Sequence, residues 1–321
     1  MYISKKMCII VVISMIIGAL LVTALNSKSQ DTTSNSANTQ DTNSQVQQNN
    51  SSDKSNSTDS NKPNDKSVNH GPVVKTQTEN VPRGAQLHLD RAVNCINNRK
   101  YNDAIEECNE AIKFDPNYDA IYAYRGMSYS LLENYEAAIN DLNQAIKINP
   151  NNSGAYGLLG YVYMNLGNFD LSMSNYNKSI QLNQNDASTY NNRGHLYYKL
   201  KNYEMAINDF NKSIQLDPKN EASYNGRGET YIALENYEAA INDFNRAIKL
   251  NPNSSRAYNG HGTAYFYLKD YNSAITDFDK AIQINPNYAV AYTNRGYAYK
   301  ALGENARAQS DFDKAQSLSN K

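Results

Sequence analysis

One 34-residue pattern is repeated seven times between Ala85 and the end of the chain, without insertion or deletion. A clear copy occupies residues 221–254, where Tyr224, Gly228 and Tyr231 are followed by Ala-Ile-Asn-Asp and the unit closes on Asn-Pro. A fixed period of this length indicates equivalent structural units that stack in a row and cover one another's apolar faces. The pattern fills the chain from Ala85 onward, so we expect any function to reside on the stacked units themselves.

Each unit contains two stretches in which small and apolar residues recur at helical spacing. In residues 119–152 they are Tyr122, Gly126 and Tyr129, followed by Ala138, Leu142 and Ala145. Glu133-Asn134 separates the two stretches, and Pro150 ends the second because proline lacks an amide proton and clashes with the preceding turn. Each unit is therefore predicted to be a helical hairpin, with most of its tyrosines used for packing.

Large aromatic, Gly, Tyr, Ala, Phe, Ala and Pro at these offsets resemble the tetratricopeptide repeat (TPR) family. In the unit from Glu221 they are Tyr224, Gly228, Tyr231, Ala240, Phe244, Ala247 and Pro252. The resemblance implies an all-α, right-handed superhelical solenoid of seven helix-turn-helix repeats, whose first helices line a concave groove. The units are 85–118, 119–152, 153–186, 187–220, 221–254, 255–288 and 289–321. Departures from the family pattern are tyrosine for the usual tryptophan, Ser172, Ser179 and Gln184 in the third unit, and His88 and Ala92 in the first.

The segment before the repeats divides into an apolar run and a polar tail. Residues 7–25 are apolar or small and follow Lys5 and Lys6. A helix of this length is about 28 Å long and matches a bilayer core, so we expect a transmembrane signal-anchor with residues 1–6 in the cytoplasm. Residues 26–84, rich in Ser, Thr, Asn and Gln, are expected to form a disordered linker. The repeats would then lie on the extracytoplasmic side; secretion after signal cleavage is the alternative.

Composition and charge argue against several classes of function. The 31 basic and 32 acidic residues leave no basic stripe for phosphates, so nucleic acid is not an expected partner. Cys95 and Cys108 are expected to form a buried thiol pair in preference to a disulfide, and His88 beside them makes too few ligands for a metal site. His195 and His261 lack a catalytic constellation. We expect no enzyme activity, metal, cofactor or small-molecule substrate.

Two positions of the repeat vary together and predict an ion pair. Position 7 is basic in six units and position 23 of the same units is acidic: Arg91 and Glu107, Arg125 and Asp141, Arg193 and Asp209, Arg227 and Asp243, His261 and Asp277, Arg295 and Asp311. Only the third unit departs, with Leu159 and Asn175. Antiparallel helices bring the two positions opposite each other, so we expect a pair within each unit. Two independent preferences that coincide are the alternative.

The last unit is adapted to face water. Positions 21 and 28 are apolar in six units, as at Ile241 and Ile248, because the following unit must cover them. In the last unit these positions are Gln309 and Gln316. This predicts that the solenoid ends here, with a capping helix whose outer face is polar.

A stripe on the first helices is the expected binding surface. It comprises positions 2, 5, 9 and 12, with 6 and 13 beside them, and its candidate residues are Asn191, Asn192, Tyr198, Asn225, Ile232, Arg256, Asn259, Phe266, Thr293 and Asn294. Asparagine both donates and accepts hydrogen bonds and suits an extended peptide backbone, while the apolar members suit its side chains. The alternative is that asparagine is simply abundant in this chain. Relatives that clamp a terminal carboxylate use lysines that are missing here.

These observations favour a membrane-anchored, outward-facing scaffold that binds a peptide segment of a protein partner in the concave groove. The alternative is a structural or self-assembly module at the cell surface without a dedicated peptide site.

Overall fold

The computed structural model describes residues 81–319, which contain fourteen α-helices and no strand. The first helices of the hairpins are α2 (Arg83–Asn97), α4 (Asp119–Leu131), α6 (Ser153–Asn165), α8 (Ala187–Lys199), α10 (Glu221–Ala233), α12 (Ser255–Tyr267) and α14 (Ala289–Ala301). The second helices are α3 (Tyr101–Phe114), α5 (Tyr135–Ile148), α7 (Phe169–Leu182), α9 (Tyr203–Leu216), α11 (Tyr237–Leu250), α13 (Tyr271–Ile284) and α15 (Asn305–Ser319). The expected all-α solenoid of helical hairpins is confirmed.

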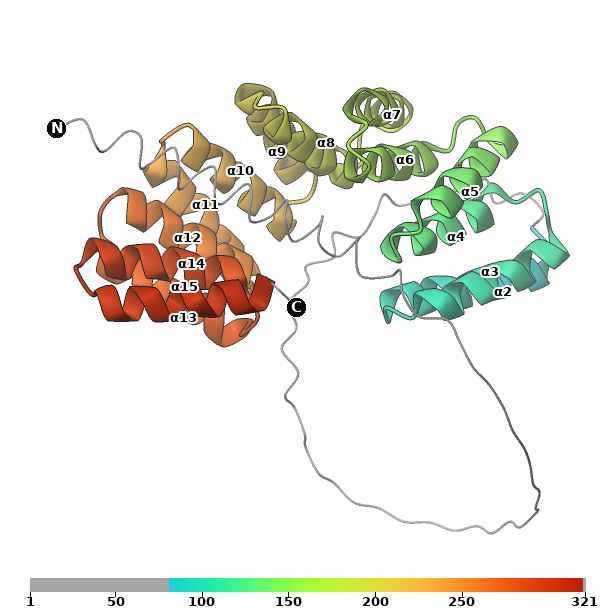
Figure 1. Ribbon diagram of the computed structural model, residues 1–321. Coiled ribbons are helices and arrows are strands. Elements are labelled where there is room, and N and C mark those ends of the chain that lie inside the picture. Colours follow the sequence, from blue (N-terminus) through green and yellow to red (C-terminus); the bar gives the residue numbers. More distant parts are fainter. Residues whose placement is uncertain (1–80, 320–321) are drawn as a thin grey trace, which may run out of the picture.

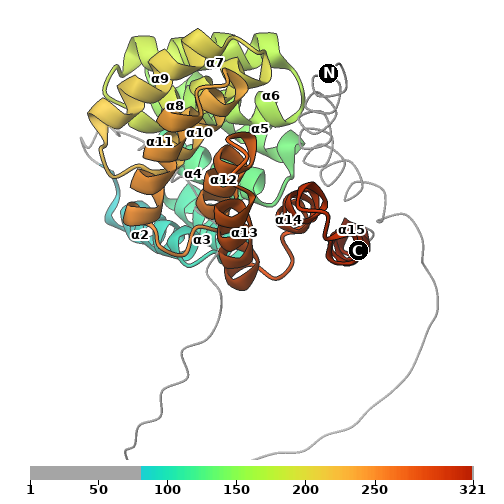
Figure 2. The same cartoon turned by 90° about the vertical axis from the view of Figure 1, so that its left-hand side faces the viewer.

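The hairpins follow one another along an arch, from α2 and α3 at one end to α14 and α15 at the other (Figure 1). A view turned by 90° shows the row winding about a common axis (Figure 2). Each second helix packs against the first helix of the next hairpin, and successive first helices such as α8, α10 and α12 also touch. Among the described helices, successive second helices make no comparable contact. The first helices therefore form the inner, concave side of the arch.

The turn inside each hairpin places one residue in the left-handed region of backbone space. These residues are Arg99, Glu133, Gly167, Lys201, Glu235, Lys269 and Gly303, with φ between 59° and 82°. Only two of the seven are glycine, although a side chain disfavours this conformation by about 1 kcal/mol or more. The turn is thus set by the packing of the two helices and not by glycine alone.

Close approach of the two helices depends on the glycine at position 8. A Cβ atom added to Gly194 would lie 2.9 Å from the ring of Phe210, and one added to Gly228 would lie 2.9 Å from the ring of Phe244. Both rings are fully buried. The small residue on the first helix therefore makes room for the aromatic residue on the second.

The predicted ion pair forms in five of the six units. Four arginines bind their aspartate through both Nε and Nη2 at 2.6–2.8 Å: Arg125 to Asp141, Arg193 to Asp209, Arg227 to Asp243 and Arg295 to Asp311. In the sixth unit Nδ1 of His261 lies 2.8 Å from Oδ2 of Asp277. The arginines also lie over tyrosine rings, as Arg193 does between Tyr190 and Tyr197 at 5.7 Å from each centroid.

The expectation was wrong in the first unit. Glu107 there pairs with His88, whose Nδ1 lies 2.7 Å from Oε2, and Arg91 is exposed. The four paired arginines also donate from Nη1 to position 25 of the preceding unit, as Arg193 does to Asn177 at 2.7 Å. Between residues 81 and 319 no earlier unit precedes the first one to hold Arg91 in this way.

The two ends of the described region differ in what they present. Gln309 and Gln316 are exposed, as predicted for a capping helix, whereas Ile241 is partly buried. At the other end α2 begins at Arg83, two residues before the expected start of the first repeat.

No helix between residues 81 and 319 has the length and apolarity needed to span a bilayer. The expected anchor at 7–25 and nearly all of the expected linker lie outside the described residues.

Candidate binding surface on the inner face

The candidate site is a set of partly exposed side chains on α8, α10, α12 and α14, which we call the inner face. Its members are Asn192, His195, Tyr198, Glu229, Ile232, Arg256, Asn259, Phe266 and Thr293. They lie at positions 2, 5, 6, 9 and 12 of successive first helices. These helices line the concave side of the arch (Figure 1). The face thus presents amide, hydroxyl, aromatic and aliphatic groups from four consecutive units.

Three of the expected surface residues do not lie on this face. Asn191, Asn225 and Asn294 are buried, each at most 2% exposed. The expectation of a surface stripe was wrong for them because contact between neighbouring first helices covers parts of positions 5 and 6. Ser223 Oγ donates to Asn191 Oδ1 at 3.0 Å, and Asn294 Nδ2 donates to Asn259 Oδ1 at 3.0 Å, so two of these amides link adjacent units.

Two buried amide oxygens beneath the face lack a hydrogen-bond partner in the described structure: Oδ1 of Asn225 and Oδ1 of Asn294. The amide nitrogen of Asn225 donates to Glu221, which fixes the orientation of its carbonyl. An unpaired buried acceptor costs roughly 1–3 kcal/mol, and a donor that reached it would recover that energy.

An ion pair crosses the middle of the inner face. Arg256 on α12 donates from Nε and from Nη2 to the two carboxylate oxygens of Glu229 on α10, each at 2.7 Å. The side chains are 40% and 28% exposed, so the pair borders the solvent. Burial alone would raise the pKa of Glu229, but the charge and hydrogen bonds of Arg256 outweigh it and lower that pKa. Glu229 in turn raises the pKa of Arg256.

His195 and Tyr198 lie beside this pair and are uncharged at neutral pH. Burial lowers the pKa of His195 to about 4, and the positive charge of Arg256 lowers it further than Glu229 raises it. Burial raises the pKa of Tyr198, and Glu229 adds to the effect. The His195 ring packs edge-on against Phe210 with centroids 5.0 Å apart, which holds it in place.

Aromatic contacts brace the apolar members of the face. The Tyr198 ring lies 5.8 Å from that of Tyr203, and the Phe266 ring lies 5.5 Å from that of Tyr271, measured between centroids. In each case a residue at position 12 of the unit, on the first helix, packs against the residue at position 17 of the same unit, on the second helix. The side chains that a ligand would meet are therefore supported from behind.

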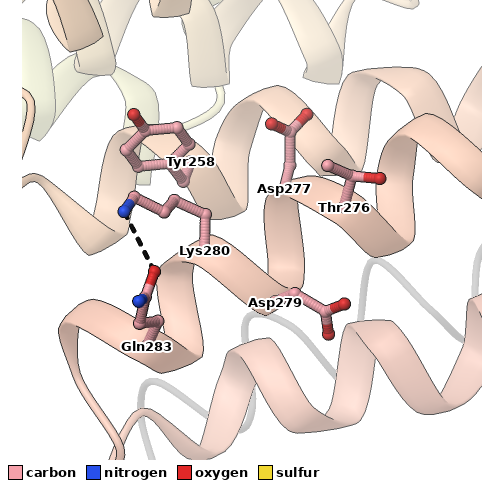
Figure 3. A pocket seen from close by; sticks show the side chains of 6 residues that line it. All are labelled: Tyr258, Thr276, Asp277, Asp279, Lys280 and Gln283. Atoms are coloured by element: carbon pink, nitrogen blue, oxygen red, sulfur yellow. Dashed lines mark hydrogen bonds between the residues drawn. The ribbon is translucent and has the colours of Figure 1, made fainter.

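A separate depression of about 560 Å³ lies away from this face, between α12 and α13 (Figure 3). Its lining residues are Tyr258, Thr276, Asp277, Asp279, Lys280 and Gln283. Its charged groups already have partners: Asp277 is held by His261, Asp279 by Arg295 at 2.5 Å, and Lys280 by Gln283 at 2.9 Å. We place the candidate site on the inner face, where amide groups remain available.

Cysteine and metal chemistry add no second site within residues 81–319. Cys95 and Cys108 are both free thiols, but only Cys108 is buried, whereas Cys95, expected to be buried with it, is partly exposed. Burial raises the pKa of Cys108 to about 12. That region holds no cluster of three or more His, Cys, Asp or Glu side chains arranged to bind a metal ion.

Sequence reasoning missed Glu229 as part of the site. Glu229 is at position 9 of one unit and Arg256 at position 2 of the next, so the pair joins units and not helices of one hairpin. An acidic residue at position 9 followed by a basic residue at the next position 2 was the available signal. The pairing itself depends on how tightly consecutive units curve.

Three family models match the chain. Models described as tetratricopeptide repeat match residues 187–220 and 222–254, and residues 289–321; a model described as TPR repeat matches residues 126–167, 160–201 and 262–303. Together they cover more than half of the 321 residues. No curated protein has a matching sequence.

Solved structures share the fold at low sequence identity. The Cut9–Hcn1 hetero-tetramer of APC/C matches with a TM-score of 0.63 and 23% identity over 67% of this chain, which spans only 42% of the matched chain. PilF of Pseudomonas aeruginosa matches with a TM-score of 0.55 and 22% identity, covering 60% of this chain and 88% of its own. A tetratricopeptide repeat protein of Parabacteroides merdae ATCC 43184 matches with a TM-score of 0.57 and 22% identity, covering 74% and 94%.

Proposed function

Because the chain belongs to the tetratricopeptide repeat family, we propose that it is a protein–protein interaction scaffold that binds a peptide segment of its partner on the inner face. One observation carries the proposal: four successive first helices together form one concave surface, to which three contribute partly exposed amide or hydroxyl groups and three contribute apolar side chains. Asn192, Asn259 and Thr293 supply the polar groups, and Tyr198, Ile232 and Phe266 supply the apolar ones.

This arrangement suits an extended chain. An extended peptide offers backbone N–H and C=O groups at regular intervals, and amide side chains satisfy both kinds. The apolar side chains recur at position 12 in units four to six, so a segment that runs along the arch meets one of them in each unit. Because both helices of every hairpin are packed, binding would require little ordering of the scaffold.

We propose further that the scaffold is not an enzyme. His195, the only histidine among the residues of the inner face, has a pKa of about 4 and lies beside an arginine that is bound to Glu229. A base of this kind is weak at neutral pH, and neither Ser, Cys nor a free carboxylate of the described face bonds to it.

Site-specific photo-crosslinking in intact cells tests the proposed surface. A photoreactive phenylalanine at Ile232 should give a discrete adduct with the partner, and the same group at Asn242, exposed on the outer helix α11, should not. Asn259→Arg should abolish the Ile232 adduct without changing the helical circular dichroism spectrum. Equal labelling from both positions, or an adduct that survives Asn259→Arg, would count against the proposal.

A row of exposed leucines favours the alternative of a self-assembly module. Position 14 directly follows the first helix in six units, and its residues are Leu132, Leu166, Leu200, Leu234, Leu268 and Leu302, each 38–51% exposed. Such a row could pack against a second copy of the chain. In that case Leu200→Glu with Leu234→Glu would lower the mass measured by light scattering, whereas the scaffold model predicts no change in mass.

We propose that residues 7–25 anchor the chain in a membrane with the repeats on the extracytoplasmic side. The support is the apolar run itself, preceded by Lys5 and Lys6. Protease added to intact cells should then remove the repeats while the anchor stays in the membrane fraction. Repeats found free in the medium would instead support secretion after signal cleavage.

A further inference from the structure

We infer that Glu229 determines which partner the inner face accepts: it binds Arg256, keeps the middle of the face electrically neutral, and so reserves that region for an uncharged peptide segment. The inference rests on the proposed function and adds the chemical class of the ligand and the residue that sets it.

The geometry shows that the charge of Arg256 is already paired with a carboxylate. Both carboxylate oxygens of Glu229 accept from it at 2.7 Å, through Nε and Nη2, which is the fork geometry in which a guanidinium binds a carboxylate most strongly. A carboxylate of a ligand must therefore displace Glu229 or approach it as a second anion. Glu229 acts as an internal competitor for any acidic partner.

A third charge acts on the pair from beneath the face: the buried carboxylate of Glu221, bound by Asn225 and Ser254, raises the pKa of Arg256. On α8, α10, α12 and α14, the positions that face inward carry only two further charged residues, Lys199 and Lys300, and both are exposed near the ends of their helices. The rings beside the pair, His195 and Tyr198, are neutral at physiological pH. The solvent-facing groups in the middle of the face thus offer hydrogen bonds without a net charge, and the buried Glu221 beneath them can only add to the repulsion of anions.

A neutral, hydrogen-bonding surface selects by a simple rule. A charged side chain laid on it loses hydration and gains no counter-charge, which disfavours binding, whereas an uncharged polar or apolar segment exchanges its contacts with water for equivalent ones. The accessible amide and hydroxyl groups of the face, on Asn192, Asn259 and Thr293, pair with the backbone groups of such a segment and carry no charge for a carboxylate. Acidic segments are excluded most strongly because they meet Glu229 itself.

Replacing Glu229 should change the preference of the inner face from uncharged to acidic peptides. The full-length chain, reconstituted in nanodiscs of uncharged lipid, is titrated against two fluorescent probes, acetyl-(Gly-Glu)4-amide and acetyl-(Gly-Gln)4-amide. Wild type should not prefer the acidic probe. Glu229→Gln, which keeps the side-chain shape and frees Arg256, should bind the acidic probe at least tenfold more tightly than wild type at low salt, and 500 mM NaCl should remove most of the gain.

Two control variants separate capture by Arg256 from a general change in charge. Glu204→Gln changes the net charge equally but lies exposed on α9, so it should behave as wild type. Adding Arg256→Gln to Glu229→Gln should abolish the gain. The inference is overturned if wild type already prefers the acidic probe, if Glu229→Gln gains no affinity for it, or if Glu204→Gln gains as much.

These outcomes are independent of the test of the proposed function. A partner segment that crosslinks at Ile232 and proves rich in Asp or Glu would overturn the neutral-ligand inference while the scaffold function stood. If the photoreactive group at Ile232 formed no adduct in the otherwise unchanged chain, the proposed scaffold function would be refuted instead.

Discussion

Breaking the ion pair between Arg227 and Asp243 should destabilise the chain in a way that depends on pH. The two side chains are 20% and 7% exposed and are joined by hydrogen bonds of 2.8 and 2.6 Å. Burial raises the pKa of Asp243 against the opposing effect of Arg227, so this carboxylate relies on its partner to remain charged. Arg227→Met keeps the length of the stem but removes the charge, and leaves the carboxylate alone among packed side chains.

The size of the effect follows from two limits. An uncompensated buried charge costs roughly 3–5 kcal/mol. The orphaned carboxyl can escape part of this by taking up a proton, which costs about 1.4 kcal/mol for each unit by which the pH exceeds an ordinary aspartate pKa of about 4. The penalty is therefore capped at roughly 4 kcal/mol at pH 7 and at roughly 1.5 kcal/mol at pH 5.

Urea unfolding of the full-length chain, followed by circular dichroism, measures both values against wild type at the same pH. Asp243→Asn and the double variant complete the cycle, and we expect the double variant to be less destabilised than the sum of the singles by about 2 kcal/mol or more at pH 7. A penalty for Arg227→Met that is below about 1 kcal/mol at pH 7, or that is the same at pH 5, would refute the reasoning.

Three further changes test other parts of the structure. Gly228→Ala should destabilise by about 1–3 kcal/mol in thermal or urea unfolding, because the new Cβ would lie 2.9 Å from the ring of Phe244; an unchanged midpoint would contradict the close approach. The pKa of His195, about 4, lies below the value of an unfolded histidine, so the unfolded chain binds the proton first and the folded chain loses stability as the pH falls from about 6.5 to about 4. His195→Gln should remove up to about 3 kcal/mol of this loss. If the stability of the variant fell with pH as steeply as that of wild type, another group would be responsible. Gln309→Ile with Gln316→Ile should promote self-association, and monomeric light scattering at all concentrations would oppose the capping interpretation.

The repeat alone was sufficient to predict the hairpins and the pairing within them. Position 7 faces position 23 in any antiparallel hairpin of this length, so the ion pair between Arg227 and Asp243 could be predicted from the sequence alone. Contacts between units were beyond this reasoning because they depend on the angle between hairpins. That angle buries Asn225, which was expected on the surface, and brings Glu229 to Arg256, which was not expected.

The first unit shows a second limit. Arg91 has the residue type and register of its equivalents, yet Glu107 pairs with His88. The pairing was inferred from interior units, in which the preceding unit also binds the arginine, so the inference failed for the first described unit, where that contact is missing. At Gln309 the change of environment could be predicted, because the residue type itself differs from that of the interior units.

The arginines that reach into the preceding unit link some neighbouring units of the arch and not others. Arg125, Arg193, Arg227 and Arg295 clasp units two to one, four to three, five to four and seven to six. Within the described chain, no such clasp reaches Asn143 or Asn245, where Leu159 and His261 replace the arginine. This hydrogen bond is therefore present at four of the six junctions between the described units and absent at two. The second of these, between units five and six, is bridged on the concave side by Arg256 and Glu229, so only the junction between units two and three lacks an arginine link of either kind within the described chain.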